Sequence, residues 1–327
     1  MDRRRAIKTL FCYSSMLGLN PLRSHAASAL APDATHILAI GDFGTTGTDQ
    51  KQVASAMATF IEQHQILPES LLLIGDNFYS KDKEGFSVDS KRWISTFEDM
   101  YPATLFPEKC WAILGNHDYH DNEGGEQVQL QYAREKKSRW SMPNKWYRFD
   151  IGGSSSLLSV IALDSNFVSI SGYNAKDKKT RPSLTKDEEK QQLEWLSREL
   201  AKPRAPITLV VGHHPLYSNG VHGDTKPLID SWGPLFEEHK VHAYLCGHDH
   251  DMQHLELEGL FTSFILSGGG GAKTRKLKNE REMPFGEAVY GFTHLELLPS
   301  RLRFTHYDAN GKKLHSFTKH QDGTVEI

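Results

Sequence analysis

From residue 36 onward, short apolar runs alternate with longer stretches in which apolar residues recur every three or four positions. Short apolar runs are typical of buried β-strands, and the longer period is typical of amphipathic helices. We expect strands over residues 36–40, 71–74, 110–114, 207–211, 241–246, 252–257, 261–266, 290–297 and 301–308, and helices over residues 48–63, 91–100, 184–200 and 225–240. Residues 308–311 (Asp-Ala-Asn-Gly) predict a hairpin turn. The alternation predicts an α/β fold, with one domain over residues 33–320 and a tail over residues 321–327.

The first five predicted strands share a feature at their carboxyl ends. Each is followed by glycine and then by a residue whose side chain can bind a metal: Gly41-Asp42, Gly75-Asp76, Gly115-Asn116, Gly212-His213 and Gly247-His248. In open α/β sheets, ligands bind in the crevice at the carboxyl ends of the strands. Glycine allows the backbone to turn sharply there, so that the next side chain can face the crevice. We therefore expect these side chains to form one site.

The residue types at these strand ends restrict the chemistry. Their mixed oxygen and nitrogen ligands argue against a purely calcium-type site, and the three cysteines do not form a zinc-binding cluster. Two metal ions are the economical interpretation, with one aspartate bridging them. Because a two-metal site activates water and binds the oxygens of an in-line displacement, the pattern predicts hydrolysis, most naturally of a phosphate ester.

Composition excludes several other classes of protein. The 327-residue chain has 38% hydrophobic and 10% aromatic residues and a formal net charge of −3. This aromatic content excludes a mainly disordered chain, and the lack of a basic excess argues against nucleic-acid binding. Three cysteines cannot supply a disulfide framework for a domain of this size. We expect Cys110 and Cys246 to be buried thiols.

Residues 1–29 resemble a twin-arginine signal peptide. Three consecutive arginines, Arg3 to Arg5, precede a modest apolar stretch over residues 10–22, and Ala27-Ser28-Ala29 offers a cleavage site. This segment carries a charge of +4, so the remaining chain carries −7. The expected mature chain is periplasmic or secreted, has no membrane span, and reaches its destination through the export machinery for folded proteins. The alternative is a disordered or membrane-touching N-terminal helix.

Taken in order, the motifs resemble those of the calcineurin-like metallophosphoesterase superfamily, specifically the small purple acid phosphatases of the tartrate-resistant type. The resemblance extends over about residues 36–318 and includes Gly75-Asp-Asn-Phe-Tyr79 and Gly247-His-Asp-His250. It implies an αββα sandwich, in which two packed mixed β-sheets are flanked by helices. It also assigns Asp42, Tyr79 and His250 to a ferric ion, Asn116, His213 and His248 to a divalent ion, and Asp76 to a bridge between the two.

Tyr79 distinguishes the purple branch from the wider superfamily. A neutral phenol is a poor ligand, but a strongly Lewis-acidic Fe(III) can hold it as phenolate. The alternative is a tyrosine that only packs against or caps its neighbours.

Two further histidines match positions that lie near the substrate in the family. His117 and His222 are candidates to hydrogen-bond the phosphate or to protonate the leaving alkoxide. The alternatives are that His117 orients Asn116 and that His222 is a solvated loop residue. We expect Asp118 and Asp249 to orient histidines rather than to bind metal.

The resemblance implies a dinuclear-metal phosphatase that hydrolyses phosphate monoesters through attack of a metal-bound hydroxide, with an acidic optimum. The implied cofactors are Fe(III) and a divalent ion, which is Fe, Zn or Mn, and the implied partner is a small phosphate ester. The alternatives are a phosphodiesterase or nucleotidase of the same superfamily, or a non-catalytic metal- or phosphate-binding protein. The polar segment over residues 171–183 is either a loop that partly covers the site or a simple solvated connector.

Overall fold

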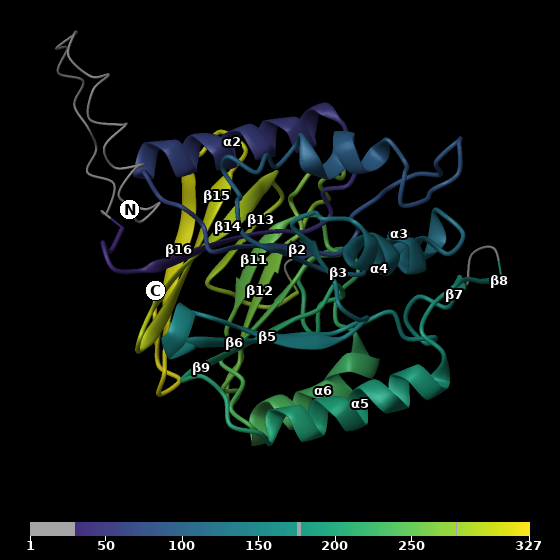
Figure 1. Ribbon diagram of the computed structural model, residues 1–327. Coiled ribbons are helices and arrows are strands. Elements are labelled where there is room, and N and C mark those ends of the chain that lie inside the picture. Colours follow the sequence, from purple (N-terminus) through teal and green to yellow (C-terminus); the bar gives the residue numbers. More distant parts are fainter. Residues whose placement is uncertain (1–29, 175–177, 279) are drawn as a thin grey trace, which may run out of the picture. The chain divides into compact units, whose positions relative to one another are not determined.

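Two mixed β-sheets form the centre of the fold, and helices cover their outer faces (Figure 1). The computed structural model describes residues 30–174, 178–278 and 280–327, so the predicted signal segment, residues 1–29, lies outside the described residues. The αββα arrangement that the resemblance implies is therefore confirmed for the described part of the chain.

The first sheet has eight strands and the second has seven. In spatial order the first contains β17 (Val325–Glu326), β16 (Lys313–His320), β15 (Arg301–Asp308), β14 (Gly291–Leu298), β1 (Thr35–Ile40), β2 (Ser70–Ile74), β3 (Cys110–Ile113) and β4 (Trp140–Ser141). The second contains β13 (Phe285–Glu287), β11 (Met252–Leu255), β12 (Ser263–Ser267), β10 (Ala243–Cys246), β9 (Ile207–Val211), β6 (Leu158–Ala162) and β5 (Tyr147–Ile151). A separate hairpin consists of β7 (Tyr173–Asn174) and β8 (Lys179–Thr180).

Parallel pairing explains why the strand-end motifs meet. β1, β2, β3 and β4 are parallel neighbours in one sheet, and β6, β9, β10 and β12 are parallel neighbours in the other. The carboxyl ends of the five predicted strands therefore lie along one edge of each sheet. At this edge Gly41 N donates to Ser267 O at 2.9 Å, and Gly270 N donates to Gly41 O at 3.0 Å, so backbone hydrogen bonds join the two sheets beside the site.

The helices are α2 (Thr48–His64), α3 (Asn116–His120), α4 (Gly125–Glu135), α5 (Lys186–Leu200) and α6 (Lys226–Glu238), with a π-helical turn over Ile94–Glu98 and a 3-10 turn over Gly153–Ser155. The α5 helix begins where a capping box forms: Glu188 N donates to Thr185 Oγ1 at 3.2 Å, and Thr185 N donates to Glu188 Oε2 at 2.8 Å. None of the helices in the described part of the chain is both long and apolar enough to cross a bilayer.

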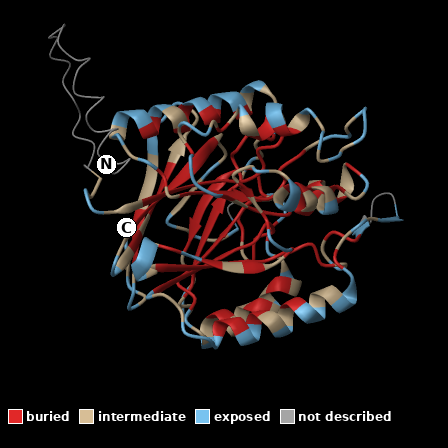
Figure 2. Cartoon of the chain, viewed as in Figure 1, coloured by how far each residue is buried: buried red, intermediate tan, exposed pale blue. Residues whose placement is uncertain are grey.

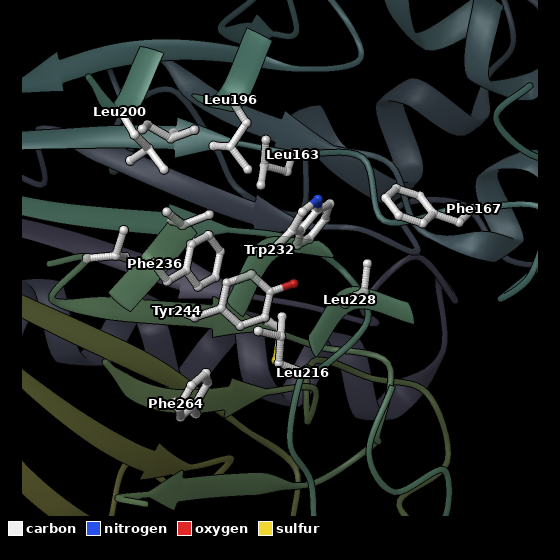
Figure 3. Packing of buried hydrophobic residues seen from close by; sticks show 14 of the residues in the cluster. Leu163, Phe167, Leu196, Leu200, Leu216, Leu228, Trp232, Phe236, Tyr244 and Phe264 are labelled. Atoms are coloured by element: carbon white, nitrogen blue, oxygen red, sulfur yellow. The ribbon is translucent and has the colours of Figure 1, made fainter. Parts of the chain in front are cut away.

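The helices hold their places through apolar faces turned toward the sheets, and their outer faces are exposed (Figure 2). Figure 3 shows this packing under α5 and α6, where Leu196 and Leu200 from α5 meet Trp232 and Phe236 from α6 above Tyr244 of β10. All five side chains are at most 1% exposed. Burying a large apolar side chain stabilises a fold by about 1.5–3 kcal/mol, so this cluster fixes β9 and β10, which carry three of the predicted site histidines at or just beyond their ends.

Several secondary-structure predictions are confirmed and some need correction. The nine expected strands and the hairpin turn after β15 form, and so do three of the four expected helices. The helix expected over residues 91–100 is shorter than predicted: residues 92–98 are helical, and Ile94–Glu98 within them form a π-helical turn. The segment expected as a tail, residues 321–327, contains β17, whose Val325 and Glu326 pair with β16. Cys110 and Cys246 are buried and free, as predicted.

Two buried histidines on β14 and β15 predict a loss of stability in acid. Burial, reinforced by a neighbouring histidine, lowers the pKa of both His294 and His306 to about 3. The unfolded chain binds a proton at a histidine with a pKa of about 6.5, whereas the folded chain does so only near the lowered pKa. The fold therefore keeps its full stability above the unfolded pKa, and it loses stability as the pH falls from there toward the folded pKa. We expect each of these two histidines to destabilise the fold by about 3 kcal/mol near about pH 4.5.

Equilibrium unfolding as a function of pH tests this expectation. The variants His294→Gln and His306→Gln should each flatten the acid limb of the stability curve, because glutamine does not titrate. His239→Gln, at a partly exposed histidine that ends α6, is the control and should leave the curve unchanged. Parallel curves for all four proteins would contradict the prediction.

Candidate metal centre

The five strand ends bring the seven predicted ligands together in two groups that share Asp76. Asp42 lies two residues after the end of β1, Asp76 lies two residues after the end of β2, and the chain after β2 continues to Tyr79. β3 ends just before Asn116, the first residue of α3. β9 and β10 end just before His213 and the segment that holds His248 and His250.

The backbone around the site is strained at the ligands themselves. Asp42, Asp76 and His248 adopt left-handed φ values of 58°, 54° and 69°. Residues other than glycine rarely adopt this conformation, and when they do they cluster at functional sites. The glycine before each ligand is predicted to make the turn, but of the five only Gly75, with φ 83°, lies in the left-handed region.

The other strand-end glycines are required because neighbouring groups approach closely. A Cβ atom on Gly115 would lie 2.2 Å from Asp76 Oδ1, and one on Gly247 would lie 2.3 Å from Asp42 Oδ2. Both distances are far below contact distance. The two glycines therefore make room for the two carboxylates.

One half of the centre contains Asp42, Tyr79 and His250. The Tyr79 hydroxyl lies 2.8 Å from Asp76 Oδ2, 3.2 Å from Asp42 Oδ1 and 3.3 Å from His250 Nε2. A carboxylate oxygen from each aspartate and a ring nitrogen of His250 lie within 4.8 Å of one another. This is the donor set that the resemblance assigns to the ferric ion.

The other half contains Asn116, His213 and His248. Asn116 Oδ1 lies 3.2 Å from His213 Nε2 and 3.0 Å from His248 Nδ1. His213 Nε2 is also 3.4 Å from Asp76 Oδ1. Since the two oxygens of Asp76 face different halves, Asp76 lies where a bridging ligand is expected.

The hydrogen bonds of two histidines show that these residues fit metal ions. His250 Nδ1 lies 2.9 Å from Lys273 O, and His213 Nδ1 lies 3.0 Å from Ile74 O. A carbonyl oxygen only accepts, so both Nδ1 atoms carry a proton, and Nε2 of each ring is the atom that faces the carboxylates and can bind a metal ion. Tyr79 has one proton to share among three acceptors. Where several hydrogen-bond acceptors converge and there are too few protons to link them, their lone pairs form a site for cations.

Charge in the centre leads to the same conclusion. Burial lowers the pKa of His213, but the carboxylates of Asp76 and Asp42 outweigh this and raise it to about 10. His213 therefore holds a proton against Asp76 in the place that a divalent cation would take. Burial and the same two carboxylates raise the pKa of Tyr79 well above 10, so that only a strongly Lewis-acidic cation could convert it to phenolate.

The two candidate catalytic histidines flank the centre in different ways. Both carboxylate oxygens of Asp121 lie 3.0 Å from His117 Nδ1, and the His117 ring lies 4.4 Å from the Tyr79 ring between centroids. Burial lowers the pKa of His117, but the hydrogen bond to Asp121 and the charge of Asp76 raise it overall. His222 is exposed, and its ring contacts that of His248 with centroids 4.2 Å apart and planes tilted by 44°.

Asp118 binds backbone groups rather than a histidine ring, so the expectation that it orients a histidine is wrong, whereas Asp249 holds a histidine through that residue's backbone. Asp118 accepts hydrogen bonds from Asn77 N at 3.0 Å, Phe78 N at 3.1 Å and Gly115 N at 2.8 Å. It thereby ties the loop after β2 to the loop after β3. Asp249 accepts from Ser218 Oγ at 2.5 Å and from His222 N at 3.1 Å, which fixes the loop that carries His222.

Sequence reasoning missed Arg275, whose Nη1 donates to His222 Nε2 at 2.7 Å. Burial lowers the pKa of His222, and the nearby Arg275 charge contributes. The signal that could have found Arg275 is the basic run over residues 273–281, which follows the glycine-rich segment after β12.

Comparison with known proteins identifies the family. The model of the calcineurin-like phosphoesterase family matches residues 35–252. The chain belongs to this family. This calcineurin-like phosphoesterase is 30% identical to tartrate-resistant acid phosphatase type 5 of Mus musculus, over 91% of this chain and 95% of that one. It is also 30% identical to purple acid phosphatase 7 of Arabidopsis thaliana, over 89% and 88% of the two chains.

Solved structures share the fold of this phosphoesterase. GAP50, described as the anchor in the inner membrane complex of Plasmodium, matches with a TM-score of 0.70 and 21% identity, over 86% of this chain and 87% of that one. Purple acid phosphatase PPD1 from yellow lupin matches with a TM-score of 0.63 and 16% identity, over 87% and 53%. The sequence relatives place the protein among hydrolases of the metallophosphoesterase superfamily, with a dinuclear metal centre as the family feature.

Proposed function

We propose that this phosphoesterase hydrolyses phosphate monoesters with an acidic optimum. The observation that carries the proposal is the convergence of seven oxygen and nitrogen donors on a buried centre with too few protons, divided into two halves by Asp76. The naming of its sequence relatives as acid phosphatases supports the same activity.

The proposed ligand sets follow the two halves of the centre. Asp42, Tyr79 and His250 would hold Fe(III), Asn116, His213 and His248 would hold Fe, Zn or Mn as a divalent ion, and Asp76 would bridge them. When bound, the metal pair would supply the Lewis acidity that lowers the pKa of water and neutralises charge on the phosphoryl group.

The two flanking histidines have the remaining roles. His117 is oriented through Nδ1 by Asp121, which leaves its Nε2 available to the phosphate or the leaving oxygen. His222 is the second candidate for this contact, and in the structure its Nε2 already accepts from Arg275. His117 would hold or transfer a proton at Nε2, and His222 would do so when Arg275 no longer donates to that atom.

Hydrolysis of one chromogenic phosphomonoester and its matched diester, from acid to neutral pH, tests the proposal. We expect the purified protein to cleave the monoester faster and to be most active in acid. Preference for the diester, or a neutral optimum that requires added Mn or Zn, would indicate a phosphodiesterase or nucleotidase instead. Metal binding with no hydrolysis of either ester would indicate a binding protein.

The proposed ferric site has a spectroscopic test. A phenolate bound to Fe(III) absorbs visible light, so the iron-loaded protein should be coloured and Tyr79→Phe should lose the band. Phenylalanine keeps the ring that packs on His117, so the variant should remain folded. Tyr147→Phe, which removes the hydroxyl of a buried tyrosine bonded to Ala112 O, is the matched control and should keep the colour. An unchanged spectrum in Tyr79→Phe would contradict the assignment.

We further propose that residues 1–29 are a twin-arginine signal and that the mature chain is periplasmic or secreted. The three arginines, the apolar stretch and Ala27-Ser28-Ala29 support this proposal. Export of an already folded chain suits an enzyme whose ligands come from five separate strand ends, because the metals can be loaded before export. Replacing Arg4 and Arg5 by lysine should leave the precursor inside the cell, which fractionation would show.

A further inference from the structure

The loop between β12 and β13 is a basic segment beside the metal centre. Its residues 273–282 contain five basic side chains and two acidic ones, although residues 30–327 together carry a charge of −7. Arg281 is paired with Asp224 at 2.7 Å, and Lys278 lies 4.0 Å from Glu280. Within the described ranges, Arg275 has no carboxylate within 4.0 Å.

Backbone hydrogen bonds hold this loop against the segments that carry two site histidines. Arg275 N donates to His250 O at 3.2 Å, and Lys273 O accepts from His250 Nδ1 at 2.9 Å. Further along, Lys278 N donates to Asn219 O at 2.7 Å. The position of Arg275 is therefore set by the same backbone that sets His250.

Among the described residues, the hydrogen-bond partners of the Arg275 side chain are both uncharged. Its Nη1 donates to His222 Nε2 at 2.7 Å and lies 3.5 Å from His248 O. A guanidinium group is always charged and can only donate, so neither contact neutralises it. The His222 ring contacts the ring of His248 and accepts from Arg275, so the guanidinium lies beside a candidate proton donor and against the backbone of a metal ligand.

We propose that Arg275 determines specificity by binding a second anionic group, a carboxylate or a phosphate, on the leaving-group part of the substrate. The inference rests on the proposed function, because the phosphoryl group being transferred would occupy the centre itself. Because His222 is a candidate to protonate the leaving oxygen, the uncompensated guanidinium beside it lies near the part of the ester that departs. Its planar fork can bind an anionic group through two parallel hydrogen bonds, which lysine cannot do.

A matched pair of substrates tests the inference. Carboxyphenyl phosphate and carbamoylphenyl phosphate, substituted at the same ring position, differ in one negative charge on the leaving group. We expect kcat/KM to favour the carboxylate by about tenfold in the wild-type protein, as is typical of a charge-assisted hydrogen bond. Arg275→Gln should reduce this ratio to about one, and Arg275→Lys should leave an intermediate ratio. Lys276→Gln, an exposed neighbour of the same charge, is the control and should keep the wild-type ratio.

The ratio of the two rates distinguishes a specificity role for Arg275 from a positioning role. If Arg275→Gln lowers kcat/KM equally for both esters, Arg275 only positions His222 and the inference is wrong. If neither ester is hydrolysed by the wild-type protein, the proposed function fails. In that case, calorimetry measures the binding of the corresponding carboxyphenyl and carbamoylphenyl phosphonates, which cannot be hydrolysed. Tighter binding of the carboxylate that is lost in Arg275→Gln would support the inference. Equal affinities for the two phosphonates would overturn the inference.

Discussion

Replacing Asp76 by asparagine should abolish turnover and prevent loading of two metal ions. Asp76 faces both halves of the centre, with Oδ2 2.8 Å from the Tyr79 hydroxyl and Oδ1 3.4 Å from His213 Nε2. Asparagine has a similar shape but lacks the charge, and it would turn an N–H₂ group toward one half. Because both ions of the proposed centre would depend on this residue for charge and spacing, we expect kcat/KM to fall by at least about a thousandfold.

Metal analysis and kinetics on the same preparation check this result. The variant should hold fewer than two metal ions per chain, and added metal should not restore the rate. Asp187→Asn, at an exposed position in the first turn of α5, is the control and should match the wild-type protein in both measurements. If Asp76→Asn retained both metals and full activity, the bridging position would be wrong.

The candidate site could be predicted because its ligands follow a rule that the sequence displays directly. Five buried strands each end in glycine and a polar residue, and parallel pairing brings those ends to one edge. Residues such as Asp42 and His213 are therefore found from their distance to an apolar run. Their division between two ions came from the resemblance, since spacing along the chain does not reveal which half of the centre a side chain faces.

Features that depend on tertiary contacts could not be predicted. The left-handed backbone of Asp42 and His248 follows from the packing of the strand ends, and these residue types alone do not indicate it. The α3 helix, Asn116–His120, is too short to show a helical period. Arg275 lies 53 residues from His222 in the chain, and only the fold of the β12–β13 loop brings the two into contact.

The second large effect concerns Asp118, which contacts no predicted metal ligand through its side chain in the structure. Its buried carboxylate accepts from three backbone N–H groups and from Gln129 Nε2 at 2.8 Å. Asp118→Ala would leave these donors without a partner, and each buried unsatisfied donor costs about 1–3 kcal/mol. Allowing for water that enters the space, we expect the free energy of unfolding to fall by about 4 kcal/mol.

Denaturant unfolding of the metal-free protein measures this loss without a contribution from bound metal. Asp118→Asn should lose less, because its amide oxygen can still accept part of the set. Asp230→Ala removes an exposed carboxylate that pairs with Lys226 on α6, and as the control it should change stability by less than about 1 kcal/mol. The same loops carry Asp76 and Asn116, so Asp118→Ala should also weaken metal binding by about 10–100-fold. A stability loss as small as that of the control would mean that the loops after β2 and β3 hold their positions without Asp118, and that the strained backbone at Asp76 is maintained by strand packing alone.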